Sequence, residues 1–186
     1  MKLSRLVAFS TLGLAALAAL GCYGGNSSGN TQAPVVLTVD LRSSPADIDM
    51  SAVVDVTVTQ MTISSQSKVP GVILSQQQDV TLKEWVVTCT RTDGGTVASR
   101  QWRNFYNVYV PANGSANLQN YRIFPGEYFR ETPLAQLFPE NGGYDSETGK
   151  RNIRQKLQVD VYGTTLAGER VVLSFPLNLN FFYGSY

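Results

Sequence analysis

Histidine is absent from this sequence of 186 residues. Catalysis of the Ser-His-Asp and Cys-His kinds needs an imidazole base, and ordinary zinc and haem sites need imidazole ligands. The sequence therefore excludes those chemistries. It also contains no recognisable signature of a cofactor site, so we expect no cofactor.

Cysteine and charge are also scarce. The chain has two cysteines, Cys22 and Cys89, and its 15 basic residues stand against 14 acidic ones. A chain with so little net charge exerts no long-range attraction on nucleic acid. We therefore expect no nucleic-acid partner.

The first 21 residues have the layout of an export signal. Lys2 and Arg5 are followed by a stretch without charge that runs from Leu6 to Leu20. At about 1.5 Å per residue this stretch is shorter than the roughly 20 apolar residues that a helix needs to cross a bilayer. We therefore interpret residues 1–21 as a signal peptide that is removed.

The signal ends in Ala19-Leu20-Gly21-Cys22, which resembles the lipobox of bacterial lipoproteins. The resemblance implies cleavage before Cys22, a diacylglyceryl thioether on its sulfur and a further acyl chain, such as palmitate, on its amine. Two or three chains attach a protein firmly to a membrane. Tyr23, where an Asp would imply retention in the inner membrane, implies an outer-membrane lipoprotein that faces the periplasm or the cell surface. The alternative is an ordinary cleaved signal peptide in which Cys22 is incidental.

Residues 22–34 then form a polar, glycine-bearing segment, which we interpret as the lipidated cysteine and a flexible tether. Removing Lys2 and Arg5 with the signal leaves 13 basic residues against 14 acidic ones, or a net charge of about −1. Lipidation of Cys22 leaves Cys89 alone, so no intramolecular disulfide can form. Residues 35–186 must therefore rest on a single core, and are long enough to build one.

From Val35 onward apolar residues alternate with polar ones, which is the pattern of half-buried strands. The pattern predicts strands at 35–41, 54–63, 80–91, 102–110, 118–124, 153–161 and 171–181. The apolar phase changes near Gln60, which indicates a bulge or a change of sheet there. Asp93-Gly94 predicts a tight hairpin, and Pro176 favours an edge position for the last strand.

The same pattern is interrupted once, where Thr132-Pro133 predicts an N-cap and a short helix through Phe138. A polar loop follows from Glu140 to Lys150. Seven strands separated by turn signals predict an all-β fold, namely an antiparallel immunoglobulin-like β-sandwich with the helix and polar loop inserted near residues 132–150. The domain is predicted to be single.

Aromatic residues in the middle strands are the first candidates for a binding surface. Alternation puts Trp102 and Tyr106 on one face of their strand, and Phe105 and Tyr109 on the other. Rings on a sheet usually belong to the core, but an exposed set could stack on sugars or contact a protein.

Acidic residues of the polar loop and one cysteine are further candidates for chemistry. Asp145 and Glu147 lie in the polar loop and are weak calcium candidates, because calcium takes oxygen ligands, but solvated turn residues explain them better and we expect no metal. Cys89 shares the phase of Trp85 and Val87, which predicts a buried and inert thiol.

The preferred interpretation is a membrane-anchored envelope lipoprotein that acts as a non-catalytic structural or protein-interaction module, with another envelope protein as its partner. The alternative is a carbohydrate-binding module that uses the aromatic residues, with a polysaccharide as its ligand. A third hypothesis is a carboxylate-dependent hydrolase, but none of the 14 acidic residues belongs to a motif that would single out a catalytic pair.

Overall fold

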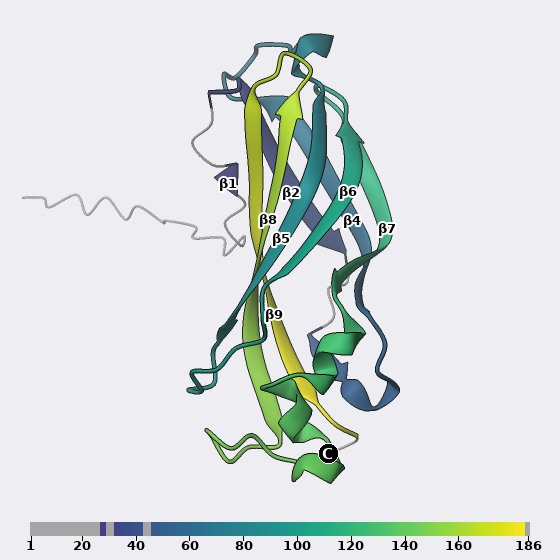
Figure 1. Cartoon of the computed structure of the whole chain (residues 1–186). Helices are drawn as coiled ribbons and strands as arrows, with labels where there is room; N and C mark the ends of the chain where they lie inside the picture. The colour runs from purple at the N-terminus through teal and green to yellow at the C-terminus, as the bar shows by residue number, and fades with distance from the viewer. Residues whose placement is uncertain (1–26, 29–31, 43–45, 185–186) are drawn as a thin grey trace, which may run out of the picture.

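The chain folds almost entirely into β-strands arranged in two sheets, as a computed structural model of the protein shows (Figure 1). The model describes residues 27–28, 32–42 and 46–184, so the predicted signal peptide and Cys22 lie outside the described residues. The prediction of an all-β fold is confirmed. Short 3-10 turns are the only helical elements within the described ranges.

The strands are β1 (Ser27–Ser28), β2 (Val35–Arg42), β3 (Asp47–Asp49), β4 (Val56–Ser67), β5 (Val80–Arg91), β6 (Trp102–Val110), β7 (Ser115–Phe124), β8 (Asn152–Thr165) and β9 (Arg170–Phe182). The 3-10 turns are η1 (Met50–Ala52), η2 (Gln76–Gln78), η3 (Gly126–Arg130), η4 (Leu134–Leu137) and η5 (Pro139–Asn141).

The larger sheet has the order β1-β9-β8-β5-β6, with β3 also pairing in parallel with β9, and the smaller sheet has the order β2-β4-β7. The long strands run along the length of the molecule and give it two distinct ends (Figure 1). One end carries η2 and the turn between β8 and β9. The other carries η3, η4, η5 and the loop that leads into β8.

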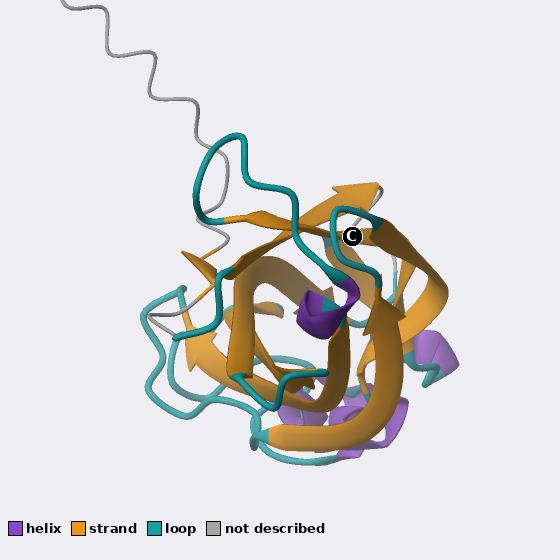
Figure 2. Cartoon of the chain, turned by 90° about the horizontal axis from the view of Figure 1, so that it is seen from above, coloured by secondary structure: helices purple, strands orange, loops and turns teal. Residues whose placement is uncertain are grey.

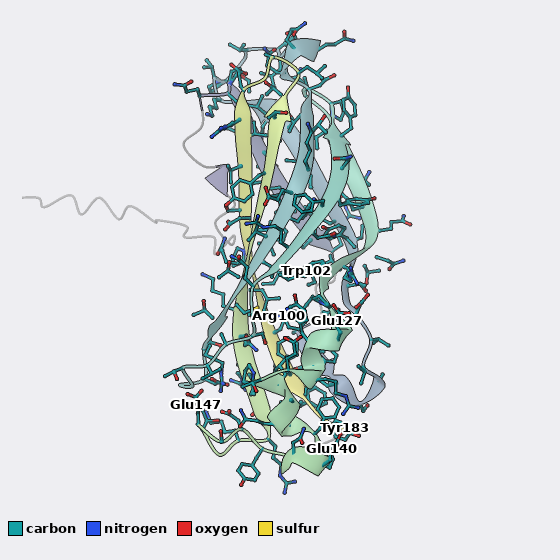
Figure 3. The ribbon with its side chains drawn as sticks, in the orientation of Figure 1. Arg100, Trp102, Glu127, Glu140, Glu147 and Tyr183 are labelled. Carbon is teal, nitrogen blue, oxygen red and sulfur yellow. The ribbon has the colours of Figure 1, made fainter. Side chains whose placement is uncertain are left out.

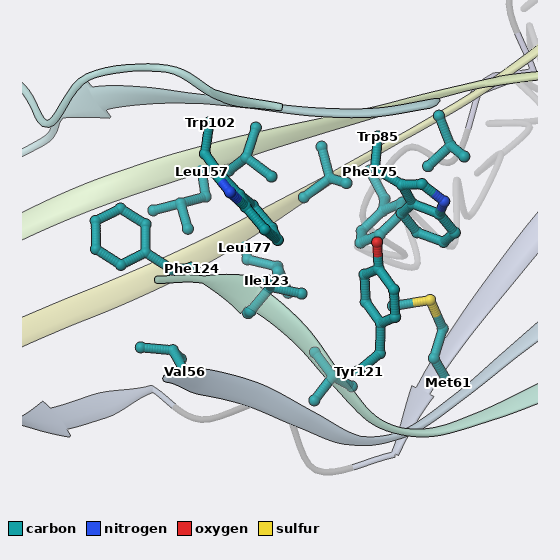
Figure 4. Close-up of a cluster of buried hydrophobic side chains, with 14 of the residues drawn as sticks. Val56, Met61, Trp85, Trp102, Tyr121, Ile123, Phe124, Leu157, Phe175 and Leu177 are labelled. Atoms are coloured by element: carbon teal, nitrogen blue, oxygen red, sulfur yellow. The ribbon is translucent and has the colours of Figure 1, made fainter. Parts of the chain in front are cut away.

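The core lies between the two sheets (Figure 4). Trp85 on β5 and Phe175 on β9 come from the larger sheet, while Met61 on β4 and Phe124 on β7 come from the smaller one, and all four are fully buried. Every second residue of β9 from Val171 to Phe181 is buried, as the alternation predicted. Burying such side chains is the main favourable contribution to folding.

The change of phase near Gln60 is confirmed, since the core receives Val58 before it and Met61 after it. The pairing with β7 continues through this point, because Val58 pairs with Tyr121 and Gln60 pairs with Gln119. β7 changes face at the same place, and its Asn120 takes a left-handed φ of 49°. The two strands therefore rotate together and keep their ladder, without a change of sheet.

The tight hairpin predicted at Asp93-Gly94 is wrong. Ten residues, 92–101, connect β5 to β6, because β5 extends past the start of β6 and pairs with β8 instead. The Asp93 carboxylate accepts hydrogen bonds from Arg91 and from the Arg154 backbone N–H. The residue thus serves a long-range contact rather than a local turn.

The predicted helix after Thr132 is replaced by short 3-10 turns. The Thr132–Pro133 bond is cis, and Pro133 rather than Thr132 occupies the cap of η4, without a capping hydrogen bond. The predicted tether also needs a correction at its end, since Ala33 is fully buried and Ser27–Ser28 pairs with β9. The packed domain therefore begins before Val35.

Pro176 lies on a strand that is only partly an edge. On one side β9 pairs with β8 along its whole length, and on the other it pairs with β1 at Leu173 and Ser174 and with β3 from Asn180 to Phe182. Pro176 falls between these two short partners. Its missing N–H is tolerated there, because no described strand pairs with that stretch of the outer edge.

Candidate functional site

The exposed aromatic residues of β6 lie on the outer surface of the larger sheet. Phe105 is 71% exposed and Tyr109 is 56% exposed, so this is the exposed set of the two that alternation distinguished. Tyr106 is half exposed. Trp102 is buried and belongs to the core (Figure 4), which removes it from the predicted binding surface.

The opposite face of β6 explains why Trp102 and Tyr106 differ from Phe105. It points toward β7, where the Arg122 guanidinium lies 5.2 Å from the centre of the Trp102 ring and the Tyr121 ring lies 5.5 Å from that of Tyr106. The Trp85 indole N–H also donates to the Tyr106 carbonyl oxygen at 3.0 Å. These contacts close the seam between the two sheets.

A third exposed ring joins Phe105 and Tyr109 from β8, a strand whose aromatic residue was not among the predicted candidates. Tyr162 on β8 is 40% exposed, and Glu84 of β5 pairs with both Phe105 and Tyr162. Cross-strand partners lie on the same face, so the two rings flank Glu84, with their backbones about 10 Å apart, or two strand spacings. We call Phe105, Tyr109 and Tyr162 the aromatic face.

A bulge in β5 creates this arrangement. The pairing of β5 with both neighbours shifts between Leu82 and Glu84, and the inward position moves from Leu82 to Trp85. Opposite the shift, a Cβ atom on Gly163 would lie 2.4 Å from the carbonyl oxygen of Thr81. Only glycine allows β8 to approach the bulge so closely.

The bulge opens a hollow of about 350 Å³ beside Tyr162. Its lining combines charged, hydroxyl and aromatic groups, contributed by Lys83, Glu84, Tyr162, Gly163, Thr164, Arg170 and Val172. The Glu84 carboxylate accepts from Arg103 Nε at 3.1 Å. The hollow is at the small end of the range for ligand pockets, and its polar groups suit a ligand that carries hydroxyl or charged groups.

Tyr109 is fixed in place by a buried carboxylate. Its hydroxyl donates to Asp79, whose other oxygen accepts from the Ala112 backbone N–H at 2.8 Å. The hydrogen bond from Tyr109 lowers the pKa of Asp79, and the same bond raises the pKa of Tyr109. Tyr109 therefore presents a rigid ring at neutral pH, which reduces the entropy lost when a ligand binds.

The two calcium candidates contact a cation of the protein itself. Arg91 donates to Asp145 at 2.7 Å and lies 3.5 Å from Glu147, and it also donates to Asp93 at 2.8 Å. The side chains of Arg91, Asp93 and Asp145 are at most 1% exposed. Among the described residues, no group of three or more acidic or cysteine side chains is arranged to hold a metal ion.

We call Arg91, Asp93, Asp145 and Glu147 the Arg91 cluster; it lies at the end of the molecule where Figure 3 labels Glu147, and its role is structural. The Glu147 carboxylate accepts from the Thr96 and Val97 backbone N–H groups at 2.8 and 3.0 Å. The cluster thereby joins the loop after β5 to the loop before β8. Burial opposes ionisation of Asp93, but hydrogen bonds from Arg91 and two backbone N–H groups outweigh it and hold its pKa at about 2.

Cys89 is partly buried against the core, and burial raises its pKa to about 12. The thiol is half-buried rather than fully buried as predicted, and the raised pKa keeps the sulfur protonated and weakly nucleophilic. Cys22, the predicted lipidation site, lies outside the described residues.

No protein-family model matches this chain, and a comparison of its sequence with curated proteins finds no match. Within the part of the chain that the structure describes, none of the helical segments has the length and apolar character needed to cross a bilayer.

Proposed function

We propose that the protein is a non-catalytic binding module of the cell envelope, held on the outer membrane by lipid on Cys22, with the aromatic face as its contact surface. The observation that carries the proposal is the exposure of Phe105, Tyr109 and Tyr162 on one face of the larger sheet. Large rings that are rigid and exposed supply much of the binding energy at protein interfaces. Another envelope protein is the proposed partner.

The domain that presents this face is proposed to be immunoglobulin-like. If the short strands β1 and β3 are left aside, seven strands remain. The first, second and fifth of them (β2, β4 and β7) form one sheet, and the third, fourth, sixth and seventh (β5, β6, β8 and β9) form the other. Strands A, B and E separate from C, F and G in the same way in immunoglobulin-like sandwiches, and the fourth strand here takes the place of C′. The buried Trp85 on the third strand also agrees with that family of folds.

Two observations favour a binding role over a hydrolytic one. The sequence has no histidine to act as a base. The carboxylates of Asp93 and Asp145, which share Arg91, are almost completely buried and held by hydrogen bonds, so a substrate cannot reach them. A pair of catalytic carboxylates must instead face each other across a space that admits substrate and water.

A carbohydrate ligand is the second candidate, because the hollow beside Tyr162 adds hydroxyl and charged groups to the rings. Hydrogen bonds from Lys83, Thr164 and Arg170 combined with stacking on Tyr162 would suit a polysaccharide. A protein partner needs a wider surface than the hollow, namely about 800 Å² on each side. The extent of the surface that a ligand protects therefore separates the two candidates.

The test is photocrosslinking in membranes solubilised with detergent, with a photoreactive residue at the exposed position Asn107 between the rings. We expect a defined crosslinked product that Phe105→Ala with Tyr109→Ala reduces at least tenfold. Tyr144→Ala is the matched control, since it removes an equally exposed ring at the far end of the molecule. A product that persists when both rings of β6 are removed would refute the proposed contact surface, whereas loss of the product on adding polysaccharide would favour the second candidate.

A further inference from the structure

The end of the molecule that carries η2 exposes aliphatic side chains that neither the core nor the aromatic face uses. Ile73 is 86% exposed, and Leu166, Val69 and Val72 are 60, 58 and 52% exposed. Single exposed aliphatic residues are common on proteins, but a group of large ones on adjoining loops marks a contact surface. We call residues 68–75 and 166–168 the tip; Figure 2 looks down on this end.

The two loops of the tip are held in place by backbone hydrogen bonds. The Leu166 N–H donates to the Asp79 carbonyl oxygen and the Ala167 N–H to that of Gln77, both at 2.9 Å. Leu74 exchanges two hydrogen bonds with the side chain of Asn113 in the turn between β6 and β7. The aliphatic side chains therefore project from a fixed platform.

The described chain passes close to the tip directly before it enters β2. The Lys68 N–H donates to the Pro34 carbonyl oxygen at 2.9 Å, directly before Val35 begins β2. Upstream, Ser27 pairs with Ser174, which lies four residues into β9 and so about 13 Å from the start of that strand. Four residues, 23–26, lie between Cys22 and Ser27, and the five steps along the chain span at most about 18 Å.

These lengths decide which end can reach a membrane that holds Cys22. The tip lies within the reach of the connecting residues. The far end does not, because β9 alone continues for eight residues, or about 26 Å, beyond Ser174. A lipid on Cys22 would therefore leave the tip, and not the Arg91 cluster, within reach of the bilayer.

We propose that the tip inserts its aliphatic side chains into the interfacial region of the bilayer that carries the lipid anchor. This rests on the proposed lipidation of Cys22. Ile73, Val69, Val72 and Leu166 would enter the boundary between headgroups and acyl chains, where burial of apolar surface is favourable. Lys83 and Arg170, exposed on the sheet just behind the tip, would lie at the level of anionic headgroups. The carboxylates of Asp79 and Glu169 nearby accept hydrogen bonds from the hydroxyls of Tyr109 and Thr165.

Insertion would also fix the orientation of the aromatic face. Arg170 and Thr164 adjoin the turn between β8 and β9, so the hollow opens close to the membrane surface. The proposed partner would therefore be met at the membrane rather than far from it.

The test uses the lipidated full-length protein in vesicles of phosphatidylethanolamine and phosphatidylglycerol that contain a lipid with a spin label on its acyl chain. An environment-sensitive fluorophore is attached to Ile73→Cys, and to Ser146→Cys at the far end as the matched control. Cys89 stays in place, because its burial keeps it unreactive; the chain without an added cysteine checks this. We expect blue-shifted emission and at least threefold stronger quenching at position 73 than at 146. Leu166→Asp should reduce quenching at position 73 at least twofold.

Other outcomes would contradict the lipid anchor, the insertion of the tip or the orientation of the domain. A protein that carries no acyl chains by mass spectrometry and does not enter vesicles would refute the lipid anchor itself. A lipidated protein whose label at position 73 emits as in water would refute insertion of the tip and leave the anchor standing. Blue-shifted emission without quenching by lipid would mean that a protein surface, such as a second copy of the chain, covers the tip. Equal quenching at positions 73 and 146 would also refute the proposed orientation.

Discussion

Arg91 stabilises the far end of the molecule through charges that water does not reach. Removing one partner from a buried ion pair leaves the other charge uncompensated, which costs about 3 to 5 kcal/mol. We therefore expect Arg91→Met to lower the free energy of unfolding by about that amount, measured by urea denaturation. Arg154→Met is the control, because Arg154 is exposed on β8. Equal urea midpoints for the two variants would show that the cluster contributes nothing to stability.

Asp93 makes the stability of the domain depend on pH in a predictable direction. Its pKa is about 2 in the folded protein against the ordinary value of 3.8, so its contribution is fully present above about pH 4 and is lost as the pH falls toward 2. A shift of this size corresponds to about 2 kcal/mol.

The measurement is the urea midpoint between pH 6 and pH 2 for the wild type and for Asp93→Asn. The variant is expected to be less stable at pH 6 and to lose less stability on acidification. The exposed Asp40→Asn variant should behave like the wild type. Parallel pH profiles for the wild type and Asp93→Asn would contradict this account of the cluster.

Among the strands, β9 contributes the longest run of alternating buried residues. Leu173→Asp puts a charge into the core, whereas Asn178→Asp puts the same charge on the exposed face, so the first variant should unfold the domain and the second should change its melting temperature by only a few degrees. Truncation before Val171 should likewise abolish cooperative unfolding. Similar melting temperatures for Leu173→Asp and Asn178→Asp would contradict the assignment of the two faces.

The bulge in β5 depends on Gly163 of its neighbour β8. Gly163→Ala introduces a methyl group against the Thr81 carbonyl oxygen, so we expect a loss of about 1 to 3 kcal/mol in the free energy of unfolding together with lost binding at the adjoining hollow. Thr90→Ala, on the exposed face of β5, serves as the control for stability. Unchanged stability of Gly163→Ala would show that the close approach of the two strands is not required.

Local pattern predicted the strands well because their period follows from burial of one face. The bounds of β5 and β6 agree with those expected from alternation and turn residues. Contacts between distant residues were not predictable in this way. Arg91 and Asp145 lie 54 positions apart, and Asp93 resembles a turn residue until Arg91 is placed beside it.

The candidate site was predictable only in part, because it too depends on contacts between residues that are distant in the sequence. Alternation separated Phe105 and Tyr109 from Trp102 and Tyr106, but which set is exposed depends on where the smaller sheet lies. Tyr162 gave a usable signal, since it stands on the polar face of its strand. The tip gave none, because apolar residues in loops follow no period that indicates burial or exposure.

The two ends of the molecule have different roles. The tip adjoins Pro34 directly before β2 and exposes aliphatic residues, while the far end is fixed internally by the Arg91 cluster and the 3-10 turns. The aromatic face lies between them on the larger sheet. An attachment by lipid near the tip would keep that face available to envelope components beside the membrane.

The proposal that lipid on Cys22 holds this domain at a membrane is tested by mass spectrometry of the amino-terminal peptide of the mature protein. We expect a peptide that begins at Cys22 and carries a diacylglyceryl group and a further acyl chain. Cys22→Ala should abolish both the modification and the association with membranes. A mature chain that begins elsewhere, or a Cys22 that carries no lipid, would contradict the claim.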